Sequence, residues 1–411
     1  MIQYNKYALP NGLKVIIHTD KTTPIIAFNL MYNVGARDED PNKTGFAHLF
    51  EHLMFGGSKN VPDFDKPLQE RGGTSNAFTN NDITNYYITI PRENLETAFW
   101  LDSDRMLELA FSPKSLEVQR NVVIEEFKQR YLNQPYGDVW LKLRPLAYKV
   151  HPYQWATIGK EISHIEHASM DDVKNFFYSH YAPNNAILCV AGNVSIQEIE
   201  PLVEKWFGEI PSRKIKPRNL PPEPKQTESR LLETGSKVPA NAIYKAWHMS
   251  KRNAPDFYST DLITDVLSRG KSSRLNQQLI KEQKLFSEIN AYITGDLDEG
   301  LLIVSGKLNK NISFEKADNA IEEVLEGVRS VALPEEELEK VKNKWMTHKL
   351  FDDMNVLNKA MNLCYYELLG DAKLYEAELD KYKSVTPLQV KESACNVLKQ
   401  TNCSTVYYAA Q

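Results

Sequence analysis

The sequence has no long apolar run that could cross a membrane. Its longest apolar stretches, such as AILCVAG, are strand-sized, well short of the roughly 18 residues that a spanning helix needs. The N-terminus, MIQYNKYALPNGLKVIIH, lacks the charged-then-apolar layout of a secretory signal. We therefore expect no membrane partner and a cytoplasmic location, or a periplasmic or organellar one if a signal has been removed.

Closely spaced cysteines and a strong charge of one sign are also missing. The cysteines Cys189, Cys364, Cys395 and Cys403 form no CxxC pair, so they indicate neither a disulfide framework nor a thiolate zinc site. The formal net charge is only -5, which gives no electrostatic reason to expect a nucleic-acid partner. We expect buried free thiols and no nucleic acid.

The chain is long enough for two domains. Its 411 residues exceed the usual size of a single domain. The clearest break in composition is a stretch rich in proline and charge, which is typical of an extended linker. We expect an N-terminal domain over residues 1–212, a linker over 213–230 and a C-terminal domain over 231–411.

Both halves present the same order of elements. In each, a strand leads to a helix, then to two strand-like runs, then to an amphipathic helix. The segments are IIAFNLMYNVG, TGFAHLFEHLMF, SNAFTNNDITNYYITIP and ENLETAFWLDSDRMLELA in the first half, and NAIYKAWHMS, DFYSTDLITDVLS, EINAYITGDLDEGLLIVSGKL and ISFEKADNAIEEVLEGVRSV in the second. The sequence predicts an α+β protein of two tandem homologous domains, each a mainly antiparallel sheet with helices packed on one face.

The helix of the first half carries an unusual polar group, HLFEH. His48 and His52 are four residues apart and Glu51 lies three residues after His48, so all three project from one helical face. Two imidazoles at this spacing suit Zn²⁺, which keeps one position for water in catalytic sites. The glutamate is then placed to take a proton from that water. We expect a zinc site here, and none on the corresponding helix of the second half.

A third ligand is expected from the helix SLEVQRNVVIEEFKQRY. On a helical projection Glu126 falls between Val122 and Val123 on the arc expected to face the core, whereas Glu125 falls toward the back as a solvated charge. A carboxylate among core-facing valines needs a partner, so Glu126 is the better ligand. Gln119 lies two turns earlier on nearly the same side and is expected to steady Glu126.

These residues carry a family resemblance. HLFEH, followed by the glutamate of NVVIEEF, resembles the inverzincin signature of the pitrilysin-type metallopeptidases. The chain is similar to their short two-domain form, as in the mitochondrial processing peptidase beta subunit and its bacterial relatives. Further similar segments are GARDEDPNKTGFAHLFEHLMFGGS, GGTSNAFTNNDITNYYITIP, YAPNNAILCVAGNV and SSRLNQQLIKEQ.

The resemblance implies a zinc endopeptidase that acts on unfolded peptides. It implies one Zn²⁺ per chain on His48, His52 and Glu126, with Glu51 as the general base. It also implies that the substrate lies extended against the strand SNAFT, whose residues Asn76, Ala77 and Thr79 bind it.

The second half departs from the family pattern. Family members that complete the site from that half carry an Arg and, seven positions later, a Tyr that hold the substrate and the oxyanion. Aligned on SSRL, this chain has Ile280 and Ser287 at those positions. Where many members also have a glutamate, it has Gln119. We therefore expect a heterodimer in which a related subunit supplies the Arg and Tyr, and a homodimer is the less favoured alternative.

Two alternatives remain open from the sequence. The rival function is a non-catalytic structural or assembly subunit, because this fold also serves in respiratory-complex core proteins without the metal site. A second histidine pair, His164 and His167 in HIEH, lacks an evident third ligand. We expect a capping or surface role for that pair.

Overall fold

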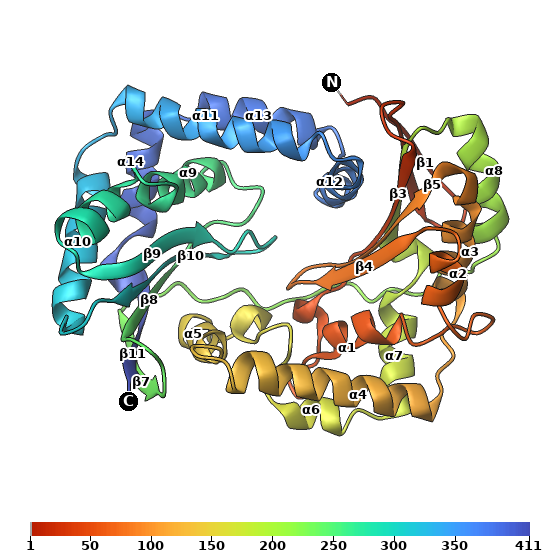
Figure 1. Cartoon of the computed structure of the whole chain (residues 1–411), viewed down its shortest axis with the longest axis horizontal. Coiled ribbons are helices and arrows are strands. Elements are labelled where there is room, and N and C mark those ends of the chain that lie inside the picture. The colour runs from red at the N-terminus through yellow and green to blue at the C-terminus, as the bar shows by residue number, and fades with distance from the viewer. Residues whose placement is uncertain (1) are drawn as a thin grey trace. The chain divides into compact units, whose positions relative to one another are not determined.

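The computed structural model describes residues 2–411, and their contacts divide the chain into two compact units (Figure 1). Each unit takes segments from both halves of the sequence. Unit 1 comprises residues up to Phe127, Trp155–Asn219 and Lys349–Ala377, and unit 2 comprises Lys128–Gln154, Leu220–His348 and Glu378–Gln411.

Unit 1 is built on a six-stranded sheet in the order β1-β2-β6-β3-β5-β4. Only the β2–β6 pair is parallel, and the other pairs are antiparallel. Strand β4 is at one end of the sheet, where its outer edge has no strand neighbour among the described residues. The strands are β1 Asn5–Ala8, β2 Lys14–Thr19, β3 Ile25–Tyr32, β4 Thr74–Thr79, β5 Thr84–Pro91 and β6 Ala186–Gly192.

Aromatic side chains join one face of this sheet to its helices. The ring of Phe28 on β3 lies 4.9 Å from that of Phe99 and 6.4 Å from that of Phe207, and Phe50 lies 5.1 Å from Tyr181. All five side chains are buried. The helices of unit 1 are α1 Phe46–Leu53, α2 Asp65–Gln69, α3 Glu96–Leu107, α4 Pro113–Phe127, α6 Ile162–Glu166, α7 Met170–His180, α8 Ile196–Phe207 and α12 Val356–Leu368, with short 3₁₀ turns at Ala36–Asp38, Arg92–Asn94 and Pro183–Asn185.

Helix α12 covers the opposite face of the same sheet, although it comes from the second half of the sequence. Its buried residues, Ala360, Leu363 and Cys364, share one hydrophobic cluster with Ile16, Ala27, Met31, Ile187, Cys189 and Ala191 of the strands. Ion pairs add to this contact: Lys6 lies 2.7 Å from Glu367, and Lys359 lies 2.7 Å from Asp20. The segment containing α12 is therefore part of the core of unit 1.

Unit 2 contains a five-stranded sheet in the order β7-β11-β8-β10-β9, in which β7 and β11 are parallel. The strands are β7 Arg230–Ser236, β8 Ala242–His248, β9 Phe286–Ile293, β10 Leu301–Leu308 and β11 Cys403–Ala410. Its helices are α5 Val139–Ala147, α9 Phe257–Ser268, α10 Phe314–Ser330 and α14 Pro387–Val397, with π-helical turns at Lys128–Leu132 and Asn276–Glu282 and 3₁₀ turns at Pro152–Gln154 and Gln400–Asn402. Helices α11 Glu335–Asp352 and α13 Leu374–Ser384 contribute residues to both units.

The architecture confirms the predicted α+β fold with two mostly antiparallel sheets. The predicted order of elements also recurs, as β3, α1, β4–β5 and α3 in the first half and as β8, α9, β9–β10 and α10 in the second. What the sequence did not predict is the exchange of segments, with 128–154 in unit 2 and 349–377 in unit 1. Among residues 2–411, no helix combines the length and the apolar character that a membrane crossing requires.

The stretch between the predicted domains has no helix or strand over residues 211–227, yet side chains fix it to each unit. Within unit 1, Arg218 donates to both carboxylate oxygens of Asp38, at 2.7 and 3.0 Å. Within unit 2, the carboxylate of Glu223 accepts from the backbone N–H groups of residues 149–151, at 2.7 to 2.9 Å. This segment is therefore extended but well anchored.

The packing of α12 predicts a large cost for cutting back its central side chain. Leu363 is fully buried in the sheet-facing cluster, whereas Leu350 in the same segment is 67% exposed. Leu363→Ala should lower the free energy of unfolding by about 2–5 kcal/mol because it leaves a cavity, and Leu350→Ala should change it by less than about 0.5 kcal/mol. Urea unfolding followed by circular dichroism measures both, and equal effects of the two substitutions would contradict the packing of α12.

Candidate metal centre and edge strand

Helix α1 begins at a glycine that no other residue replaces easily. Gly45 has φ 88°, a left-handed conformation, and a Cβ atom there would lie 2.7 Å from the carbonyl oxygen of Ile158. Phe46, Leu49 and Phe50 then bury one side of the helix. The other side, with His48, Glu51 and His52, is only partly buried, which leaves these polar side chains accessible.

A buried carboxylate caps the start of this helix. Glu39 accepts hydrogen bonds from the backbone N–H groups of Gly45 and Ala47, both at 2.9 Å, and from the indole N–H of Trp155 at 3.0 Å. Carboxyl oxygens at this position satisfy N–H groups that have no partner within the helix. Burial is the main cause that raises the pKa of Glu39 to about 8, and the three hydrogen bonds oppose that rise.

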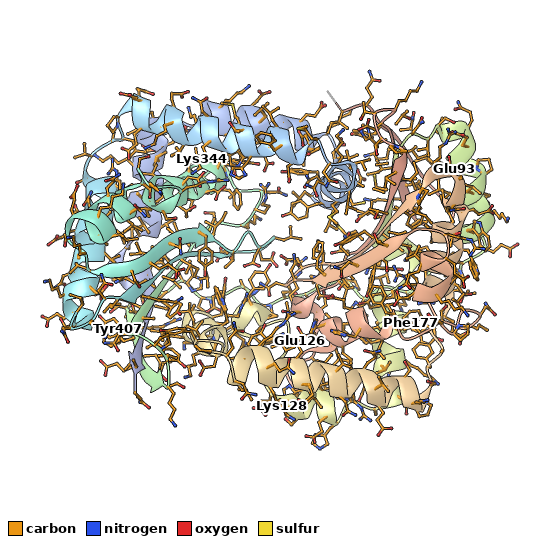
Figure 2. All side chains as sticks on the ribbon, viewed as in Figure 1. Glu93, Glu126, Lys128, Phe177, Lys344 and Tyr407 are labelled. Atoms are coloured by element: carbon orange, nitrogen blue, oxygen red, sulfur yellow. The ribbon has the colours of Figure 1, made fainter. Side chains whose placement is uncertain are left out.

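The predicted metal ligands converge from two helices. His48 and His52 Nε2 atoms are 3.4 Å apart, and a carboxylate oxygen of Glu126 lies 3.7 Å from the first and 3.4 Å from the second. Figure 2 labels Glu126 on α4, the helix that passes α1. Within residues 2–411, this is the one cluster of histidine, cysteine and acidic side chains with ligand atoms close enough to hold a metal ion.

These three donors fit zinc. Ligands at ordinary Zn–N and Zn–O distances in a tetrahedron are separated by about 3.3 to 3.4 Å, close to the spacings of 3.4, 3.7 and 3.4 Å found here. Two imidazoles and one carboxylate are also a donor set of catalytic zinc sites, which leave the fourth position open. The side chains are 13 to 24% exposed, so solvent reaches the cluster.

Glu51 lies near the edge strand of the sheet, beside Thr79. The hydroxyl of Thr79 also lies 3.5 Å from that of Thr84, to which it can donate. Burial raises the pKa of Glu51 above its ordinary value, and the Thr79 hydroxyl is the largest of the effects that oppose this rise. Glu51 is thus a separate carboxylate next to the ligand cluster.

The other two residues predicted to bind substrate lie on the same strand. Asn76 and Ala77 are in β4, and the side-chain oxygen of Asn76 accepts from the N–H of Ala77 at 2.8 Å. The strand is paired on one side only, with β5. Helix α1 contacts this strand. Their role in binding a peptide stays a prediction.

The environment of Glu126 differs in part from the sequence prediction. Val123 is fully buried, but Val122 is 43% exposed, so the prediction that both valines face the core was wrong for Val122. The buried stripe of α4 runs through Leu116, Val123 and Phe127 instead, and Glu126 lies at its border. Gln119 lies beside Gly56, and its predicted effect on Glu126 stays a prediction.

Two residues near α1 were not recognised from the sequence as part of this site. One is Glu39, which no local pattern marks as a helix cap because it precedes the helix by several residues. The other is His164, whose Nδ1 accepts from the backbone N–H of Thr44 at 3.2 Å and lies 2.8 Å from the Thr44 hydroxyl. His164 therefore steadies the residue before Gly45, in line with the structural role expected for HIEH.

Ile280 and Ser287, which stand where the family pattern has an Arg and a Tyr, have structural roles in unit 2. Ile280 is partly buried in the π-helical turn Asn276–Glu282 and packs against the core of that unit. Ser287 is exposed on β9, where its hydroxyl donates to the carbonyl of Lys307 at 3.3 Å. Neither side chain offers a cation or a phenol.

Comparison with known proteins accounts for both halves of the chain. Residues 14–154 match the family described as Insulinase (Peptidase family M16), and residues 167–344 match the Peptidase M16 inactive domain. The chain is 31% identical over 350 residues to the zinc protease PqqE of Helicobacter pylori, covering 83% of this chain and 78% of that protein. The chain belongs to peptidase family M16.

Two solved structures share the fold of this chain. A protease from Helicobacter pylori matches with a TM-score of 0.93 at 27% identity, over 99% of this chain and 100% of that one. Pitrilysin shares the fold, with a TM-score of 0.78 at 19% identity over 100% of this chain and 45% of its own. The predicted pitrilysin-type resemblance is confirmed, as is the expected class of enzyme, an M16 metallopeptidase.

The cap on α1 predicts a pH-dependent stability. The carboxyl of Glu39 keeps its proton up to about pH 8 in the native state, whereas its ordinary pKa is 4.5. Unfolding therefore releases a proton between these values, so this group makes the free energy of unfolding fall as the pH rises through that window. Glu39→Gln lacks this contribution. The free energy of unfolding of the original protein, relative to that of Glu39→Gln, should therefore fall between pH 5 and pH 8. Urea unfolding at several pH values measures both free energies, and a difference that stays constant with pH would contradict the raised pKa.

Proposed function

We propose that this M16 peptidase is a zinc-dependent endopeptidase that hydrolyses unfolded peptides, with one Zn²⁺ on His48, His52 and Glu126. The observation that carries the proposal is the convergence of those three ligand atoms next to a second carboxylate, Glu51, which is outside the cluster. The name of the Helicobacter pylori relative, a zinc protease, points the same way. Zinc bound there would supply a Lewis acid that polarises a peptide carbonyl and lowers the pKa of water.

In this proposal Glu51 is the general base. It is on the same face of α1 as the two histidines but is not part of the ligand triangle, so it remains free to accept a proton. It takes the proton from the attacking water and then delivers it to the nitrogen of the leaving amine. Thr79, its neighbour on β4, places it beside the strand where the peptide would lie.

The free edge of β4 accounts for a preference for unfolded chains. An extended peptide can add to an exposed sheet edge through backbone hydrogen bonds, which depend little on sequence. Such pairing needs a peptide whose own N–H and C=O groups are free, and a folded protein does not offer them. The proposed substrates are therefore unfolded peptides of varied sequence.

The rival function, a non-catalytic assembly subunit, has no support from the site. A subunit that had lost catalysis would have no need of two histidines and a glutamate with zinc-like spacing. Zinc held only for stability is disfavoured as well, since structural sites usually have four protein ligands and this cluster has three.

Replacing the base should separate metal binding from hydrolysis. Glu51→Gln should retain about one zinc per chain but lose turnover by at least about 10²-fold, because the amide cannot accept the proton. Glu126→Gln should instead lose zinc, since it changes a ligand. Zinc content by atomic absorption and cleavage of quenched fluorescent peptides measure the two effects. Undiminished turnover by Glu51→Gln would rule out its role as the base, and a metal-free original protein would favour the assembly subunit.

A partner subunit is part of the proposal. With Ile280 and Ser287 in place of an Arg and a Tyr, these two positions offer no group to hold the substrate backbone and the oxyanion. A related subunit of similar size that carries the Arg and Tyr would supply them. The match of residues 167–344 to a domain described as inactive is consistent with this arrangement.

The partner can be tested with the zinc-loaded chain alone. We expect it to cleave the peptide library slowly or not at all, and to gain at least about 10²-fold in turnover with the partner, as expected when an oxyanion donor is restored. Light scattering gives the oligomeric state in the same samples. A stable homodimer with full activity would contradict the heterodimer.

A further inference from the structure

Arg105 on α3 is a buried cation in unit 1. Its side chain is 1% exposed, and it forms an ion pair with Asp102, which lies one turn earlier on the same helix and is fully buried. Among the described residues, the Nε and Nη1 atoms of Arg105 have no hydrogen-bond partner. Taking a guanidinium and a carboxylate out of water costs free energy, which an ion pair offsets only when its remaining polar atoms are also satisfied. The stability of the core alone therefore does not explain this pair.

Three aromatic rings lie around the guanidinium where hydrogen-bond acceptors would be expected. The Cζ atom of Arg105 lies 4.4 Å from the centre of the Tyr86 ring, 4.5 Å from that of Phe64 and 5.5 Å from that of Phe55. The Phe55 ring lies 5.5 Å from the Phe64 ring and 6.1 Å from the Tyr86 ring. A cation over the face of an aromatic ring is attracted by the negative charge of that face. We call Phe55, Phe64, Tyr86 and Arg105 the arginine cage.

The arginine cage joins the end of α1 to the sheet. Phe55 follows α1, Phe64 precedes α2, and Tyr86 is on β5, the strand next to the edge strand β4. The Tyr86 hydroxyl also donates to the carbonyl of Phe50 in α1, at 3.4 Å. The guanidinium of Arg105, from α3, thus holds side chains of three other parts of unit 1 together.

The end of α1 that the cage holds is the end that carries His52. A helix of eight residues is not held in place by its own hydrogen bonds. Glu39 holds its first turn, whereas Phe55 in the cage comes only three residues after His52. The Nε2 atom of His52 lies 3.4 Å from a carboxylate oxygen of Glu126, and zinc needs its ligands near this spacing. A shift of this end of α1 would change that distance directly.

We propose that Arg105 is a positioning residue for the metal cluster. Its cage fixes the C-terminal end of α1 against β5 and α3, and this sets His52 at the distance from Glu126 that zinc requires. The inference rests on the proposed function, in which zinc binds to His48, His52 and Glu126. It gives a reason for a buried charge at a place where apolar side chains of similar volume are often at least as stable.

The test replaces both members of the ion pair, in the double variant Arg105→Met/Asp102→Ala. Methionine keeps a long side chain that packs well against aromatic rings, and the second substitution avoids an unpaired buried carboxylate, which would be strongly destabilising. The urea midpoint of the metal-free variant should therefore match that of the original protein. Its zinc affinity, measured by competition with a chromophoric chelator, should be about 10- to 100-fold weaker, as found for groups that orient metal ligands.

Unit 2 offers a matched control. Arg252 and Glu378 form an ion pair with both side chains 9% exposed, and the Cζ atom of Arg252 lies 4.5 Å from the centre of the Phe257 ring. Arg252→Met/Glu378→Ala should leave the zinc affinity unchanged within about twofold, because it is independent of the α1 packing. Cobalt bound in place of zinc gives a spectroscopic readout, since its visible absorption depends on the geometry of its ligands. The bands should change in Arg105→Met/Asp102→Ala and match those of the original protein in the control.

The possible results separate this inference from the function on which it rests. If the original protein binds zinc and the folded Arg105→Met/Asp102→Ala variant binds it equally well, the inference fails and the proposed function stands. Equal losses of zinc affinity in this variant and in the control would overturn the inference too. An original protein that binds no zinc would overturn the proposed function and the inference with it.

A second variant decides the case if the double variant does not fold. Arg105→Lys keeps a cation beside Asp102 but loses the planar group that stacks on the aromatic rings. Zinc binding weaker by at least about threefold in Arg105→Lys, with its urea midpoint close to that of the original protein, would support the positioning role. Unchanged zinc affinity together with an unchanged cobalt spectrum would overturn it.

Discussion

The close approach of α4 to α1 is the contact on which the rest of the site depends. Helix α1 has eight residues, too few to be stable by itself, so its position comes from buried aromatic contacts and from Glu39. Helix α4 buries Leu116, Val123 and Phe127 and thereby sets Glu126 against the two histidines. The spacing of 3.4 to 3.7 Å among the ligand atoms is a product of this packing, and zinc needs such a spacing.

The edge strand gives the site its second feature. An exposed sheet edge is normally a liability because it can pair with any extended chain. Here β4 is mostly polar, with Thr74, Ser75 and Asn76, and it contacts the helix that carries Glu51. The same property that would promote aggregation elsewhere would serve here to bind a substrate by its backbone. A cluster of metal-ligand side chains next to a free strand edge is the arrangement that the proposed cleavage of unfolded peptides requires.

The sequence predicted the parts of the site that depend on local periodicity. The spacing of His48, Glu51 and His52 defines one helical face, and the helical projection singled out Glu126 even though Val122 proved to be exposed. Local periodicity says nothing of partners distant in the chain. Glu39 caps a helix through a loop, and His164 reaches Thr44 across 120 positions, so neither is visible in a single helix pattern.

The exchange of segments between the two units also explains what the sequence could not predict about the fold. The apolar side of α12 could pack on either sheet. Its own residues do not indicate that it packs on the sheet of unit 1. Cys189 and Cys364 show the same limit. They are far apart in sequence, but α12 brings their side chains into hydrogen-bonding contact, where burial raises the pKa of the Cys189 thiol. The expectation of buried free thiols holds for Cys189, Cys364 and Cys403, whereas Cys395 is exposed.

The most direct test of the account is anomalous X-ray scattering at the zinc absorption edge from crystals of the zinc-loaded chain. The account predicts one strong peak per chain, about 2.0 to 2.2 Å from His48 Nε2, His52 Nε2 and a carboxylate oxygen of Glu126. The carboxylate of Glu51 should remain outside that distance. A peak at another place, or zinc bound directly by Glu51, would contradict the assignment of ligands and base.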